Sequence, residues 1–197
     1  MVTTIYLDFD NTIVESNKRI IEMLNDKYNM DKTEDDLKDY NYSSIYPITE
    51  KEKNQMFESD NFYNGLEFKS GVLDVLNKYY QIYNIVIKSM GTGENLRKKK
   101  EWLINNMPDN LDFIFIGSNE NIRKEINMSG AIQIDDNSDC LKTNATLKIL
   151  YKNFHNFPWQ KPDINADEFM MVNTWGEIDS ILGFYEEYDC KTLEKNK

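Results

Sequence analysis

An apolar run near the N-terminus, IYLDFD at residues 5–10, ends in two aspartates that are separated by one residue. A second apolar run, GAIQIDD at residues 130–136, ends in two adjacent aspartates. Short β-branched runs that lead into polar residues are typical of buried parallel strands. In an open parallel sheet, ligands bind at the carboxyl ends of the strands. These two runs therefore predict strands that present carboxylates at a binding edge.

Strand-like and helix-like segments alternate along the chain. Runs typical of strands lie at residues 3–8, 83–89, 111–117, 130–136 and 146–151. Runs with helical period lie at residues 68–80, 93–107 and 174–187. This alternation predicts an α/β fold, in which a Rossmann-like parallel sheet has helices on both faces.

The stretch from residue 16 to residue 65 is polar, and its apolar residues recur at helical spacing. Capping-box patterns at Thr33 and Thr49 predict two further helix starts. No convincing strand pattern interrupts this stretch. We therefore expect a small helical cap subdomain at 16–65, inserted after the first strand, with residues 1–15 and 66–197 forming the core domain.

The charge of the chain limits the class of partner. The net charge is −11 over 197 residues, which argues against binding of long nucleic acid. A small phosphorylated substrate is still compatible with this charge, because a bound cation or a local positive site can offset the repulsion.

The sequence has no signal-peptide pattern and no apolar run of about 18 residues, so we expect a cytoplasmic protein without a membrane partner. The oligomeric state is left open between a monomer and a homodimer.

The predicted topology gathers polar side chains at one edge of the sheet. They are Asp8 and Asp10 after the first strand, Ser89 at the end of the second, Lys124 before the fourth, and Asp135 and Asp136 at its end. Four carboxylates in one pocket would repel one another, and a divalent cation removes that conflict. Oxygen-only ligands and a phosphate substrate favour Mg²⁺.

Four motifs carry a resemblance to a known superfamily. LDFDNT at residues 7–12 resembles the first motif of haloacid dehalogenase-like phosphotransferases. Ser89, Lys124 and the IDD at 134–136 resemble the second, third and fourth motifs, in that order. Arg123 is an alternative to Lys124, and Asn11 stands where the family usually has glycine.

A narrower resemblance covers most of the chain from about residue 4 to residue 182. NFYNGLEFKSGVLDVL (61–76), KKEWL (99–103) and VNTWGEIDSIL (172–182) resemble segments of the 5′(3′)-deoxyribonucleotidases. The resemblance implies a Mg²⁺-dependent phosphomonoesterase that hydrolyses ribo- or deoxyribonucleoside monophosphates through an aspartyl-phosphate.

The resemblance also implies a role for each site residue. Asp8 would be the nucleophile and Asp10 the acid and base. Phosphate would be bound by Ser89 and Lys124, and the rest of the substrate by Phe62, Tyr63 and Lys99. The metal would be held by Asp8, the Asp10 backbone carbonyl, and Asp135 or Asp136. These residues also have structural alternatives; for example, Ser89 fits a helix cap and Lys124 a solvated surface lysine. Phe62 and Tyr63 fit core positions equally well, and Lys99 lies in a basic run typical of a solvated helix face.

Two other functions stay open. One is a phosphatase of the same superfamily for another small metabolite such as a sugar phosphate, and the other is a non-catalytic nucleotide-binding protein on the same fold. The paired aromatic residues and the TWGEI segment favour nucleotides. The presence of both aspartates of the first motif favours catalysis.

Overall fold

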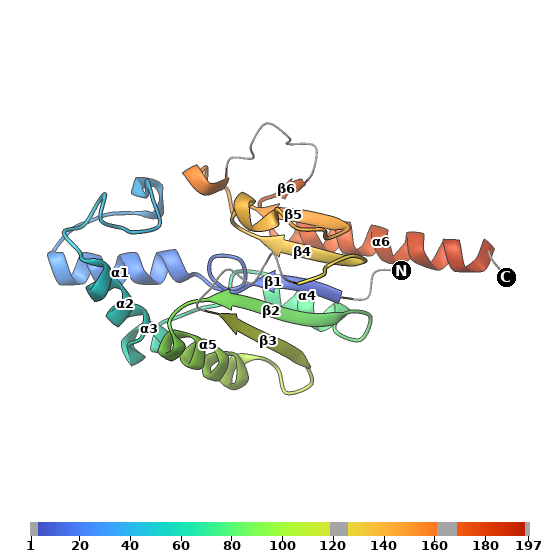
Figure 1. Cartoon of the computed structure of the whole chain (residues 1–197), viewed down its shortest axis with the longest axis horizontal. Coiled ribbons are helices and arrows are strands. Elements are labelled where there is room, and N and C mark those ends of the chain that lie inside the picture. Colours follow the sequence, from blue (N-terminus) through green and yellow to red (C-terminus); the bar gives the residue numbers. More distant parts are fainter. Residues whose placement is uncertain (1–3, 119–125, 161–168, 196–197) are drawn as a thin grey trace.

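The protein is built on one six-stranded parallel sheet (Figure 1). The computed structural model describes residues 4–118, 126–160 and 169–195. The strand order is β3-β2-β1-β4-β5-β6. The strands are β1 (Thr4–Asp8), β2 (Asn84–Met90), β3 (Phe113–Ser118), β4 (Ala131–Asp135), β5 (Leu147–Tyr151) and β6 (Met170–Val172). This arrangement confirms the predicted α/β, Rossmann-like parallel sheet.

Helices make up most of the remaining structure. The α-helices are α1 (Ser16–Tyr28), α2 (Glu50–Phe57), α3 (Asp60–Asn64), α4 (Val72–Tyr79), α5 (Gly93–Asn106) and α6 (Trp175–Lys195). Short 3-10 helices are η1 (Glu34–Asp36), η3 (Ser138–Leu141) and η4 (Pro158–Gln160). Within these described ranges no helix is both long and apolar enough to cross a membrane.

Two local features differ from the sequence expectation. The capping box at Thr33 forms as predicted, but it opens only the three-residue η1, because Leu37 already has an extended backbone. The residue pattern does not predict strand β6. It has three residues, and Met170 and Met171 are exposed, so it carries no alternation that a sequence pattern could detect.

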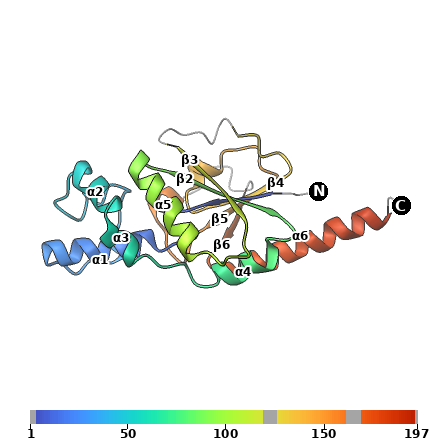
Figure 2. The ribbon, with the colours of Figure 1, turned by 90° about the horizontal axis from the view of Figure 1, so that it is seen from below.

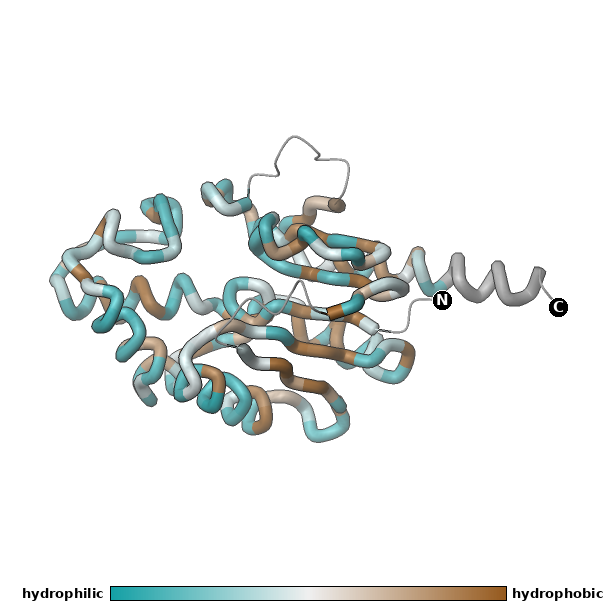
Figure 3. The backbone as a smooth tube through the Cα atoms, viewed as in Figure 1, coloured by the Kyte–Doolittle hydropathy of each residue, from teal (hydrophilic) through white to brown (hydrophobic). Residues whose placement is uncertain are grey.

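The main core lies on one face of the sheet. Ile5 and Leu7 of β1 point to this face, and the parallel register places Ile85 and Ile87 of β2 beside them. Apolar side chains from α4, α5 and α6 complete this cluster, including Val72, Leu76, Leu103, Ile178 and Leu182. Figure 3 shows the corresponding hydrophobic segments on the strands.

The opposite face carries a smaller cluster of Met128, Ala131 and Ala145, with Tyr6 and Ile126 packed against it. Tyr6 alternates with Ile5 and Leu7 along β1, so it points away from the main core. Seen from below, α4 and α6 run together beneath the sheet (Figure 2). The helices α4 and α6 thus lie on the face of the main core, and the smaller cluster packs on the other face of the sheet.

The segment containing α1, η1, α2 and α3 lies beyond the carboxyl ends of the strands (Figure 1). The chain enters and leaves this segment side by side. The Glu15 N–H donates to the Glu67 carbonyl at 2.9 Å, and the Lys69 N–H donates to the Ile13 carbonyl at 2.9 Å. Lys69, which is buried, also pairs with the Glu15 carboxylate. An inserted segment at 16–65 requires its two ends to lie side by side, as they do here. The division of the chain into a core domain and a cap stays a prediction.

The last helix is anchored by the indole of Trp175, which is 1% exposed and donates through Nε1 to the Thr12 carbonyl at 3.1 Å. We expect Trp175→Phe to lower the free energy of unfolding by about 1–3 kcal/mol, because it leaves that carbonyl buried without its donor. Urea unfolding measures the change. Phe184→Leu is the control, because Phe184 on the same helix is 68% exposed. Equal stability of both variants would contradict the anchoring role.

A row of stacked rings joins the inserted segment to the loop after β5. Tyr40 stacks on Trp159 with ring centroids 4.1 Å apart, and Trp159 stacks on Phe157 at 4.5 Å. Phe157 in turn stacks on His155 at 4.7 Å. Residues that are more than 110 positions apart in the sequence are therefore packed together.

His155 ends this row with a polar contact to η1. Its Nδ1 lies 3.1 Å from an Asp35 oxygen, and its Nε2 lies 3.6 Å from a Glu34 oxygen. The interaction with the Glu34 carboxylate, together with that of Asp35, outweighs the opposing effect of burial and raises the pKa of His155 above 6.5.

This raised pKa predicts a pH-dependent stability. A group whose pKa is higher in the folded state stabilises the fold fully below its unfolded pKa of about 6.5, and that contribution is lost as pH rises through the folded pKa. We expect wild type to exceed His155→Gln in unfolding free energy at pH about 5.5, with the difference shrinking towards pH about 8.5. Chemical unfolding across this range measures it. A difference that stays constant with pH would show that the imidazolium pairing contributes nothing.

Candidate active site

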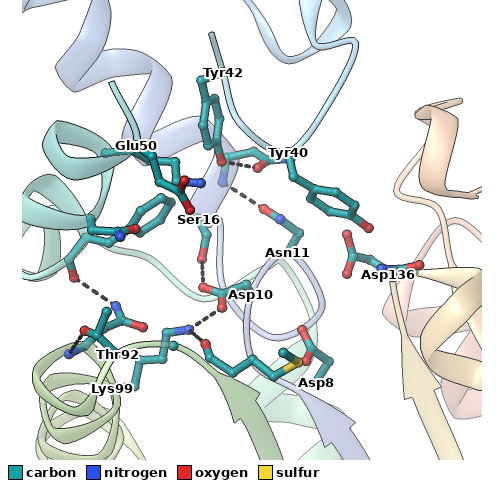
Figure 4. A pocket seen from close by; sticks show the side chains of 18 of the residues that line it. Asp8, Asp10, Asn11, Ser16, Tyr40, Tyr42, Glu50, Thr92, Lys99 and Asp136 are labelled. Carbon is teal, nitrogen blue, oxygen red and sulfur yellow. Dashed lines mark hydrogen bonds and ion pairs between the residues drawn. The ribbon is translucent and has the colours of Figure 1, made fainter. Parts of the chain in front are cut away.

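A cavity of about 750 Å³ opens at the carboxyl edge of β1, β2 and β4. The wall on the core side is formed by the strand ends and by the loop that begins α5. The other wall is formed by the inserted segment. The residues lining the cavity include Asp8, Asp10, Asn11, Ser16, Asn17, Tyr40, Tyr42, Glu50, Lys53, Asn54, Phe57, Thr92, Asn95, Lys99, Asp135 and Asp136. Figure 4 shows this arrangement.

Three buried carboxylates meet at the floor of the cavity. Asp8 ends β1, Asp135 ends β4, and Asp136 follows directly. The strand register explains the meeting, because Leu7 lies opposite Ile134 and the following residues are therefore neighbours. One oxygen from each of the three side chains lies within 4.8 Å of the others.

The electrostatics of this cluster indicate a cation site. Burial, reinforced by the charges of Asp8 and Asp135, raises the pKa of Asp136 well above its usual range, although the indole of Trp159 opposes this by donating to Asp136 Oδ2 at 3.3 Å. Grouped buried carboxylates are stable in the charged form when a cation offsets them. The ligands are all oxygens, which fits Mg²⁺.

Asp10 lies outside this cluster and is held by hydrogen-bond donors. Its Oδ1 accepts from the Ser16 hydroxyl at 2.7 Å, and its Oδ2 pairs with the Lys99 ammonium. The Ser89 hydroxyl lies 3.5 Å from the same Oδ2. The side chain is 30% exposed, so one side of the carboxylate faces the cavity.

Lys99 of α5 is only 2% exposed, so it is not part of a solvated helix face. Its ammonium donates to the Ser89 hydroxyl at 2.8 Å and to the Met90 carbonyl at 3.1 Å, and it lies 5.4 Å from the centroid of the Phe9 ring. Ser89 shares the face of β2 that carries Ile85 and Ile87, and α5 packs on that face. The helix therefore brings a fixed positive charge to the carboxyl edge of the sheet.

The loop that follows Asp8 and Asp10 is shaped by Asn11. This residue has φ 55°, a left-handed conformation that asparagine adopts more readily than most residues. Its side-chain oxygen accepts from the Asn17 N–H at 2.7 Å, which ties the loop to the first turn of α1.

Comparison with known proteins assigns this arrangement to a family. The profile of the family described as 5′ nucleotidase, deoxy (Pyrimidine), cytosolic type C protein matches residues 1–183. The chain belongs to this family. It is accordingly a phosphoric monoester hydrolase of the nucleotidase type, with a haloacid dehalogenase-like fold. No curated protein gives a significant match.

Solved structures confirm the fold of this nucleotidase-family chain. A haloacid dehalogenase-like hydrolase from Streptococcus pneumoniae has a TM-score of 0.61 and 14% identity, with 93% of this chain and 98% of that one covered. A similar hydrolase from Xanthomonas campestris gives 0.55 and 12%, covering 92% and 94%. A Bacillus subtilis HAD-hydrolase described as bound to magnesium gives 0.55 and 14%, covering 91% and 98%.

The expected substrate residues Phe62 and Tyr63 are not among those that line the cavity in the described part of the chain. Phe62 is 0% exposed and packs edge-to-face on Phe57, and the Tyr63 hydroxyl is bonded to Asn95. The structure therefore supports the alternative that Phe62 and Tyr63 are core residues and not substrate contacts. Phe57, which packs in front of Phe62, lines the cavity instead.

The sequence patterns do not predict the aromatic wall of the cavity, which includes Tyr40 and Tyr42. These tyrosines lie in a loop with neither helical nor strand period, so no pattern marks them. Ser16 carried only the weak signal of its closeness to the first motif. Lys124 and its alternative Arg123 lie outside the described residues.

Proposed function

We propose that this protein hydrolyses nucleoside monophosphates, with deoxyribonucleotides as the main substrates, in a Mg²⁺-dependent reaction. The observation that carries the proposal is a single cavity that has Asp8, Asp10 and Lys99 at one end and an aromatic wall at the other. The family description, which names a deoxy (Pyrimidine) nucleotidase of cytosolic type, supports both the substrate class and a cytoplasmic location.

Asp8 is the proposed nucleophile. Its carboxylate oxygen attacks phosphorus, the ester bond to the nucleoside oxygen breaks, and an aspartyl-phosphate forms. A water molecule then attacks the same phosphorus and frees Asp8 and inorganic phosphate. A bound Mg²⁺ supplies charge neutralisation for the phosphoryl oxygens, and Asp8, Asp135 and Asp136, together with the Asp10 carbonyl, are the groups proposed to hold it.

Asp10 is the proposed acid and base. It gives its proton to the leaving nucleoside oxygen in the first step, and it removes a proton from the attacking water in the second. The Lys99 ammonium and the Ser89 hydroxyl, which are 2.8 Å apart, would donate to the phosphoryl oxygens. Lys124 keeps its proposed role as a further phosphate ligand.

The leaving nucleoside would lie against the inserted segment, which we propose acts as the cap. Tyr40, Tyr42 and Phe57 offer ring faces, and stacking on an aromatic ring tolerates any base. Glu50 and Asn54 on α2 line the same wall and offer hydrogen-bonding groups to a base or sugar. Closing this wall would also exclude water from the reaction.

The test is phosphate release from a panel of 5′- and 3′-nucleoside monophosphates, ribo and deoxy, together with sugar phosphates. Each is assayed with Mg²⁺ and with EDTA. We expect release from deoxyribonucleotides that EDTA abolishes and Mg²⁺ restores. Release from sugar phosphates alone would replace the nucleotidase proposal with the metabolite phosphatase, and full activity in EDTA would contradict the metal dependence.

A further inference from the structure

The first residue of α1 makes a direct contact with the proposed acid/base. The Ser16 hydroxyl donates to Asp10 Oδ1 at 2.7 Å, and Ser16 is 1% exposed. The other oxygen of Asp10, Oδ2, faces Lys99 and Ser89. Figure 4 shows Ser16 and Lys99 approaching the carboxylate from different sides.

We propose that Ser16 is a positioning residue. By holding Oδ1, it fixes the rotation of the Asp10 carboxylate so that the other oxygen, Oδ2, is presented to the leaving group. This inference rests on the proposed role of Asp10. An aspartate carboxylate that is paired at only one oxygen can rotate about its two side-chain bonds, and a misplaced acid transfers its proton less effectively. Pairing at both oxygens removes that freedom.

The surroundings of Ser16 make its position firm. The next residue, Asn17, donates its N–H to Asn11 at 2.7 Å and accepts from the Tyr42 hydroxyl at 2.7 Å. Tyr42 lines the cavity on the side of the inserted segment. The first turn of α1 therefore joins the aromatic wall, the motif loop and the acid/base in one hydrogen-bonded unit.

The test compares two aryl esters that differ in how much they need an acid. Phenolate is a poor leaving group and needs proton donation, whereas p-nitrophenolate leaves readily without it. We expect Ser16→Ala to lower kcat/KM for phenyl phosphate by about 10-fold and for p-nitrophenyl phosphate by less than about 2-fold. Ser16→Thr, which keeps the hydroxyl, should restore most of the loss.

Two controls make this result specific. Ser180→Ala removes an exposed hydroxyl on α6 and should leave both esters unchanged. Asp10→Asn should show the same dependence on the leaving group as Ser16→Ala, with a larger loss. Because the esters carry no nucleoside, failure of the nucleotide panel would not affect this readout.

An equal loss on both esters would show that Ser16 acts only through general structure, and it would overturn the proposal. The proposal would equally fall if Ser16→Ala matched wild type on phenyl phosphate. It would also fall if Ser16→Thr were as slow as Ser16→Ala.

Discussion

Asp8→Asn is expected to lower the rate of phosphate release by about 10⁴-fold or more, because the amide oxygen is a far weaker nucleophile than the carboxylate. Asp8 is 6% exposed and ends strand β1. Steady-state phosphate release from a deoxyribonucleoside monophosphate measures the loss.

Asp74→Asn is the matched control, because Asp74 is an exposed carboxylate on α4. Asp8→Asn should also remain folded. It removes one of three mutually repelling buried carboxylates, so in EDTA its melting temperature should equal or exceed that of wild type. A variant that turned over near the wild-type rate would show that the nucleophile has been assigned wrongly.

Lys99→Met is expected to lower kcat/KM by about 10²–10³-fold, the usual loss when a fixed donor to a transferring group is removed. Methionine keeps much of the apolar length of the side chain and removes the ammonium that contacts Ser89, Met90 and Asp10. The same steady-state assay measures the loss for nucleotides and for aryl phosphates.

Lys100→Met is the control for this prediction, since Lys100 is the next residue on α5 and is exposed. It should keep wild-type activity. If both variants were equally active, the buried ammonium would have no part in the reaction, and the positive charge would have to come from elsewhere in the chain.

The sheet and its acidic edge could be predicted from sequence for a physical reason. Strands β1 and β4 carry apolar residues on both faces and end in carboxylates, and parallel topology brings such ends together. Asp8, Asp135 and Asp136 meet as that topology requires. The register of β1 and β4 brings these residues to one edge of the sheet.

The cavity wall could not be predicted in the same way. Whether Phe62 or Phe57 faces the cavity depends on how α2 and α3 pack, and both residues lie in similar helical patterns. Lys99 lies among four consecutive basic residues, and only the rotation of α5 against β2 decides that this one is buried. Tertiary packing, which no local pattern records, determines both outcomes.

The most direct test of the account is a search for the covalent intermediate on Asp8. In Asp10→Asn the base that activates water is missing, so with p-nitrophenyl phosphate the first step should proceed and the second should stall. We predict a stoichiometric burst of p-nitrophenolate, followed by slow release, with mass spectrometry after an acid quench locating the phosphoryl group on Asp8. The Asp8→Asn/Asp10→Asn double variant should give neither. Linear release without a burst, or a phosphoryl group on another residue, would contradict nucleophilic catalysis by Asp8.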